Sequence, residues 1–80
     1  MLAPLPPREM VVFISYENQV SPEQTAREMV QALNIGRAEY GLDLFTGGCE
    51  VRTGFDRSLL EEIIYWLRAR QIIFDLNYLY

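Results

Sequence analysis

The stretch that decides the fold is Leu42-Asp43-Leu44-Phe45-Thr46-Gly47-Gly48-Cys49-Glu50-Val51-Arg52-Thr53. Apolar and polar residues alternate on both sides of a Gly-Gly pair, which predicts a β-hairpin closed by a two-residue turn, because primed turns require positive φ. The predicted register places Phe45 opposite Glu50 and Asp43 opposite Arg52. One face then carries Leu42, Leu44, Cys49 and Val51, and the other carries the opposite-charge pair of Asp43 and Arg52.

The segment before the hairpin predicts a strand and a helix. Met10–Tyr16 is a nearly unbroken apolar run, as is typical of a strand in the middle of a sheet. Ser21 can cap a helix with Pro22 in its first position, and apolar residues at helical spacing continue to Leu33. Residues 35–41 are either a loop or one further helical turn.

The segment after the hairpin predicts a second helix and a last strand. The helix begins near Asp56 or Ser58 and carries an apolar stripe as far as Leu67. Residues 72–80 alternate, with Asp75 on the polar side. The order strand, helix, strand, strand, helix, strand predicts an α+β fold, the ferredoxin-like βαββαβ sandwich, with both helices on one face of a four-stranded sheet.

This arrangement implies one domain with an uncovered sheet face. Residues 1–9 read as an extended Pro-rich arm and residues 10–80 as a single small α+β domain. The side of the first strand that the helices do not cover would still carry apolar side chains, joined by Phe45. We expect this face to contact a partner, either another protein or a second copy in a homodimer. The alternative is that the arm folds over it.

Composition excludes several classes of function. The chain has 80 residues, no His and a net charge of −4, and all seven cations are Arg. Imidazole metal ligation is impossible, and Cys49 is the single cysteine, so we expect no metal, no cofactor and no enzyme activity. The acidic balance disfavours direct binding of nucleic acid, and no apolar run suits a membrane span. A lone thiol and the lack of a signal-peptide pattern indicate a cytoplasmic protein.

From residue 11 onward the sequence also resembles the first half of Toll/interleukin-receptor (TIR) domains. Val12-Phe13-Ile14-Ser15-Tyr16 is similar to the opening strand of that family, and Glu50-Val51-Arg52-Thr53-Gly54 to part of its interaction loop. The resemblance implies a truncated flavodoxin-like α/β half-domain with a parallel sheet, in which residues 47–53 are a loop. It also implies protein association through Glu50–Gly54. The glutamate needed for the family's NAD cleavage has no counterpart here, so that activity is not implied.

These observations favour a non-catalytic protein–protein interaction module. We expect a small acidic inhibitor of the phage type, docking on a basic or nucleic-acid-binding surface of a host or defence protein. The alternatives are a TIR-like adaptor fragment acting through residues 50–54 and an obligate homodimer with a structural role. The candidate contact residues are exposed carboxylates with their neighbouring cation and aromatics: Glu17, Glu39, Tyr40, Asp43, Phe45, Glu50, Arg52 and Asp75.

Overall fold

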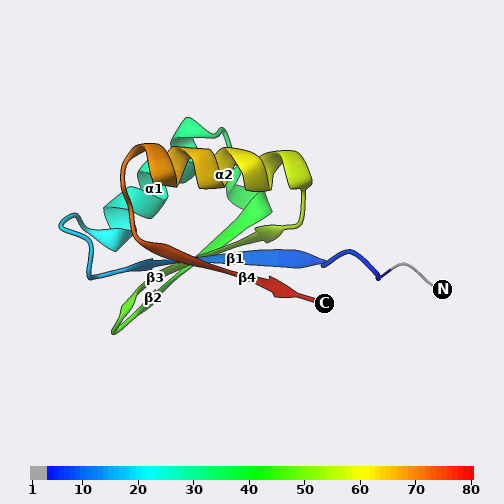
Figure 1. Cartoon of the computed structure of the whole chain (residues 1–80), viewed down its shortest axis with the longest axis horizontal. Coiled ribbons are helices and arrows are strands. Elements are labelled where there is room, and N and C mark those ends of the chain that lie inside the picture. The colour runs from blue at the N-terminus through cyan, green and yellow to red at the C-terminus, as the bar shows by residue number, and fades with distance from the viewer. Residues whose placement is uncertain (1–3) are drawn as a thin grey trace.

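A computed structural model describes residues 4–80, in which two helices cover one face of a four-stranded antiparallel sheet (Figure 1). The elements are β1 Glu9–Ser15, α1 Pro22–Ala32, the 3-10 turn η1 Arg37–Glu39, β2 Tyr40–Phe45, β3 Gly48–Gly54, α2 Arg57–Ala69 and β4 Phe74–Leu79. The strand order is β2-β3-β1-β4, so β1 is central, paired with β3 on one side and β4 on the other. The predicted ferredoxin-like arrangement is confirmed.

Side-chain caps explain where both helices begin. The Ser21 hydroxyl accepts a hydrogen bond from the backbone N–H of Gln24 at 3.3 Å, and Pro22 occupies the first turn of α1 as predicted. For α2 the cap is Asp56 rather than Ser58, since its carboxylate accepts from the N–H groups of Ser58 and Leu59.

Both helices end in the same motif. Asn34 and Gln71 follow the two C-caps with φ of 61° and 58°, the left-handed conformation that reverses the chain after a helix. The N–H groups of Ile35 and Ile72 then bond back to Val30 O and Leu67 O at 2.8 and 3.0 Å. The first bond satisfies a carbonyl that the end of α1 would otherwise leave free, and the second gives Leu67 O a further donor beside Arg70 N at 3.2 Å.

The core lies between the helix layer and the sheet. Met10, Val12 and Ile14 of β1 point toward the helices and are at most 1% exposed. They pack with residues of β3 and of both helices, chiefly Ala26, Met29, Cys49, Val51, Ile63 and Leu67. Alternation along β1 therefore sends its odd-numbered side chains to the side away from the helices.

The hairpin forms, but its predicted register is wrong by two residues. Thr46 and Gly47 make the turn, and Asp43 lies opposite Glu50 rather than Arg52. Gly48 is the first residue of β3, where a Cβ would collide with the backbone oxygen of Ile14 on β1. Only a residue without a side chain fits this close approach, and with Gly48 in the strand the turn lies one residue earlier than predicted. Since side chains alternate with a period of two, a shift of two residues keeps every side chain on its predicted face.

The antiparallel pairing of β2 with β3 decides between the two arrangements considered for the sheet. Residues 48–54 lie in a strand and not in a loop, so the parallel sheet that the TIR resemblance implies is not formed. None of the helices in residues 4–80 is long and apolar enough to cross a membrane.

The predicted N-terminal arm is partly described. Pro4–Pro7 form neither helix nor strand and lead away from the end of the sheet (Figure 1), so this part of the arm does not cover the sheet face. Residues 1–3 of the arm lie outside the described residues.

Candidate protein-binding face

The side of the sheet that the helices leave uncovered is the candidate site, and we call it the open face. It is built from alternate residues of all four strands: Glu9, Val11, Phe13 and Ser15 of β1, Gly41, Asp43 and Phe45 of β2, Gly48, Glu50, Arg52 and Gly54 of β3, and Asp75, Asn77 and Leu79 of β4. Their positions follow from the register, because residues directly opposite one another in a sheet share a face.

Apolar side chains form the centre of the open face. Val11 is 7% exposed and Phe13 is half-buried, although no helix covers either. A Cβ placed on Gly48 would lie 2.9 Å from the Phe13 ring, so the ring extends over this bare backbone position of β3. Phe45 and Leu79, on the two edge strands, remain 51% and 42% exposed.

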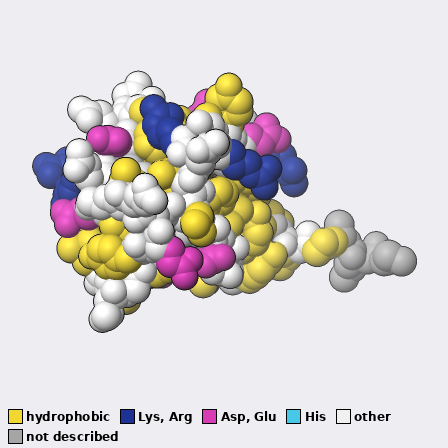
Figure 2. All heavy atoms as spheres, turned by 60° about the vertical axis from the view of Figure 1, so that its left-hand side comes forward, with side chains coloured by type: hydrophobic (Ala, Val, Ile, Leu, Met, Phe, Trp, Pro, Cys, Tyr) yellow, Lys and Arg dark blue, Asp and Glu magenta, His cyan; other side chains and the backbone are white. Residues whose placement is uncertain are grey.

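Carboxylates flank this apolar centre. Phe13 lies directly between Glu50 on β3 and Asp75 on β4, and Asp43 follows Glu50 on the edge strand β2. This row across the sheet therefore contains three acidic residues and one aromatic residue. Figure 2 shows magenta acidic side chains among yellow hydrophobic ones along the lower, sheet side of the molecule.

Arg52 partly neutralises the acidic row. Its Nη2 donates to Asp43 Oδ2 at 3.1 Å, and its Nε lies 3.7 Å from Glu50 Oε1. The guanidinium thus binds two carboxylates that would otherwise repel each other across the strands. Asp75, on the other side of Phe13, has no cationic side chain within 4.0 Å among the described residues. Four carboxylates, those of Glu9, Asp43, Glu50 and Asp75, share this face with one guanidinium.

The structure brings together five of the eight residues that the sequence predicted as contacts, namely Asp43, Phe45, Glu50, Arg52 and Asp75. The other three lie elsewhere. Glu17 is in the turn after β1, Glu39 is in η1, and Tyr40 is half-buried on the helix side of β2 opposite Thr53. Glu9 and Asn77 were not predicted as contacts. Asn77 could have been found from the alternation of residues 72–80, whereas Glu9 was assigned to the N-terminal arm and lies in β1.

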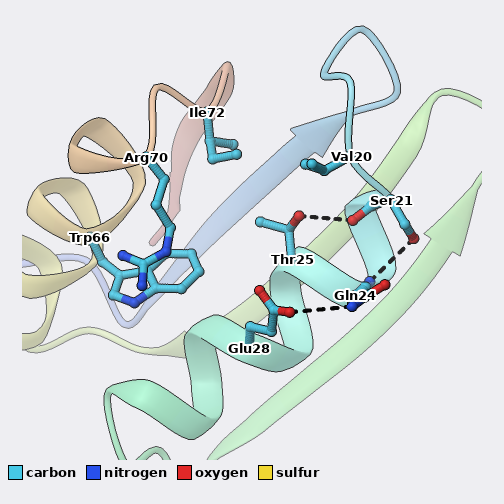
Figure 3. Close-up of a pocket in the computed structure, with 8 residues that line it drawn as sticks. All are labelled: Val20, Ser21, Gln24, Thr25, Glu28, Trp66, Arg70 and Ile72. Atoms are coloured by element: carbon cyan, nitrogen blue, oxygen red, sulfur yellow. Dashed lines mark hydrogen bonds between the residues drawn. The ribbon is translucent and has the colours of Figure 1, made fainter.

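A second concave feature lies in the helix layer, between α1 and the end of α2 (Figure 3). This groove of about 430 Å³ is lined by Val20, Ser21, Gln24, Thr25, Glu28, Trp66, Arg70 and Ile72. Its polar groups already have structural roles. Thr25 Oγ1 donates to Ser21 O at 2.8 Å, and the Arg70 guanidinium stacks 3.9 Å from the centroid of the Trp66 ring. The groove is therefore explained by capping and stacking and is not the preferred site.

The side chains of the open face are suited to binding another molecule by contact. No cluster of three or more metal-ligating side chains occurs in residues 4–80. Comparison of the chain with protein-family models, with curated proteins and with solved structures found no match.

Proposed function

We propose that this protein is a non-catalytic binding module whose open face docks on a basic surface of another protein. The observation that carries the proposal is the row in which Phe13 lies between Glu50 and Asp75. An apolar centre with a charged rim is the usual anatomy of a protein interface. The excess of carboxylates selects a partner with Arg or Lys side chains and speeds the encounter.

The same charges argue against two other occupants. Aromatic residues on a four-stranded sheet are a surface on which single-stranded RNA can stack, but carboxylates beside Phe13 would repel the phosphates. A homodimer through the open face would bring the acidic rows of two copies together, and like charges at an interface disfavour association.

Within this class, we favour an inhibitor that occupies a nucleic-acid-binding surface of a host or defence protein in the cytoplasm. The three carboxylates of the row that contains Phe13 would place negative charge against the basic surface on which such a partner binds phosphates. DNA and the acidic protein would then compete for the same site. The TIR-like adaptor alternative would act through a loop at residues 50–54. These residues lie in β3, so the alternative is not favoured.

The direct test is a titration with a short synthetic peptide of alternating Arg and Leu, followed in amide correlation spectra. We expect the amide signals of Phe13, Glu50 and Asp75 to shift and those of the helices to remain in place. Replacing Asp43 and Glu50 together with Lys should weaken binding at low salt by about tenfold or more, and added salt should reduce the difference.

The matched control carries the same change of net charge on the helix layer, with Glu28 and Glu62 replaced by Lys, because both side chains are exposed there. This variant should bind the peptide nearly as well as the natural protein. Equal weakening by both variants, or shifts confined to the helices, would rule out docking through the open face.

A further inference from the structure

Strand β4 forms one edge of the sheet, and its pairing with β1 decides which backbone groups remain free. Even-numbered residues of β1 bond to β3, as shown by Tyr16 N to Gly47 O at 3.1 Å just beyond its end. Arg8, just before β1, bonds to both neighbours, with its O accepting from Phe55 N at 3.0 Å and its N–H donating to Leu79 O at 2.8 Å. Odd-numbered residues therefore bond to β4, where their partners are Asp75, Asn77 and Leu79. The free edge carries the N–H and C=O groups of the alternate residues Phe74, Leu76 and Tyr78.

The side chains around Leu76 repeat the same classes in both directions along the chain. The residues one position away from Leu76 are polar, Asp75 and Asn77. Those two positions away are aromatic, Phe74 and Tyr78, and those three positions away are aliphatic, Ile73 and Leu79. In an antiparallel pair of β4 strands related by a two-fold axis at Leu76, each residue would face its counterpart from the other copy. The facing pairs would be carboxylate with amide, aromatic with aromatic, and aliphatic with aliphatic. The aromatic pair is favourable in sheets, and no pair places like charges opposite each other.

The backbone requires the same register. Antiparallel strands exchange both hydrogen bonds only between residues whose groups point at each other. A two-fold axis at Leu76 pairs Leu76 with its own copy and Phe74 with Tyr78, and these are the residues whose groups face the free edge. Side chains and backbone therefore select one pairing, and β4 contains no Pro or Lys that would block it.

The side of α2 that lies above β4 also carries opposite charges, Glu61 and Arg68, which could pair with those of a second copy. Trp66 faces α1, which packs over β3 and β1, so the opposite flank of α2 lies toward β4 (Figure 1). A shallow depression there is lined by Glu61, Ile64, Tyr65, Arg68 and Ala69, and Tyr65 is 77% exposed. A two-fold axis would set two α2 helices antiparallel, with Glu61 of each copy facing Arg68 of the other.

We propose that β4 is a homodimerisation edge, pairing antiparallel with β4 of a second copy around a two-fold axis at Leu76. The result is a continuous eight-stranded sheet with all four helices on one side and two open faces side by side on the other. This proposal does not depend on the identity of the docking partner. Its hydrogen bonds use the free backbone groups of Phe74, Leu76 and Tyr78, whereas the side chains of Asp75 and Asn77 belong to the open face as well. The dimer would present the acidic surface twice to a basic partner.

The test uses a swap of two exposed residues. Asn77→Asp places two carboxylates opposite each other, twice per dimer, and should raise the dissociation constant of the dimer by about tenfold. The double variant D75N/N77D restores a carboxylate–amide pair and should return the constant to within about twofold of the original. On α2, Glu61→Arg should weaken the dimer and E61R/R68E should restore it.

Light scattering and sedimentation at micromolar concentration should report a dimer mass. Amide hydrogen exchange gives a residue-level readout, because the N–H groups of Phe74, Leu76 and Tyr78 should be protected at high protein concentration and exposed on dilution. A monomer throughout the micromolar range would overturn the proposal. So would a dimer in which these three amides exchange freely, or one that is unaffected by Asn77→Asp. Peptide binding by the open face would survive each of these outcomes, so the two proposals fail independently.

Discussion

Asp43 lies directly across the β2–β3 ladder from Glu50, so two carboxylates face each other on the open side of the sheet. The Arg52 guanidinium, 3.1 Å from one and 3.7 Å from the other, makes this arrangement tolerable. The protein thus keeps a like-charge pair and a cation beside the half-buried Phe13. A surface selected only for stability would not need the second carboxylate.

Replacing Arg52 with Met should lower the free energy of unfolding at low salt by about 0.5–1 kcal/mol, because the repulsion between Asp43 and Glu50 is then uncompensated. Both members of the closer pair are 46% exposed, which limits the effect. Adding Glu50→Gln to the Arg52→Met variant should recover most of the loss. Urea denaturation at low and high salt measures the free energy of unfolding of the single and the double variant. If the single variant loses as much stability at high salt as at low salt, charge repulsion is not the cause.

Gly48→Ala should destabilise the protein by about 2–3 kcal/mol, since the added Cβ meets the backbone oxygen of Ile14 and lies 2.9 Å from the Phe13 ring. The matched control is Gly41→Ala on β2, where a Cβ has no heavy atom within 4 Å. Thermal unfolding should separate the two variants clearly. Similar behaviour of both would mean that Gly48 is not required by the approach of β3 to β1.

Asn18→Ala should lower the free energy of unfolding by about 1–2 kcal/mol, because this side chain makes the hydrogen bonds to Ile73 that a strand backbone would make inside the sheet. Its Oδ1 accepts from Ile73 N at 2.6 Å, and its Nδ2 donates to Ile73 O and Ser15 O, each at 2.9 Å. Hydrogen exchange of the Ile73 amide should accelerate in the variant. Gln19→Ala, at the exposed neighbouring position, is the control and should leave that amide unchanged.

Cys49 should resist thiol reagents in the folded protein. Its side chain is 0% exposed, and burial together with the negative charge of Glu23 raises the pKa of the thiol, so the reactive thiolate is scarce. With Ellman's reagent at mildly alkaline pH we expect labelling at least about a hundredfold slower than in urea. A thiol placed at the neighbouring position by E50C, in a chain with Cys49→Ala, should react quickly.

The raised pKa of Cys49 also sets the sign of a pH effect. Above about pH 8.5 the unfolded thiol loses its proton first, so the unfolded state binds fewer protons and the free energy of unfolding falls as pH rises. The Cys49→Ala variant should lack this part of the alkaline decline. Denaturation curves collected on both proteins across this range provide the comparison.

Local patterns were sufficient for the elements and their faces. The first helix starts at the predicted cap, Ser21, and the second at Asp56, one of the two predicted caps. The alternation of residues 72–80 places the Asp75 side chain on the other face of the strand from Phe74 and Leu76. The hairpin register was wrong because a Gly-Gly pair is a turn signal, whereas the contact that requires Gly48 lies on a strand more than thirty residues earlier. No local pattern contains that contact.

The sequence by itself determined that Asp43, Glu50 and Arg52 share one face of a hairpin, because side chains in a strand alternate with a period of two whatever the exact register. Only the tertiary structure decided that this face continues across Phe13 to Asp75. That row exists because β1 lies between β3 and β4 and pairs with both. These pairings are long-range backbone hydrogen bonds, and the burial of Met10, Val12 and Ile14 under both helices holds β1 in place. The same strand order leaves β4 at an edge, where the backbone groups of Phe74, Leu76 and Tyr78 point away from β1.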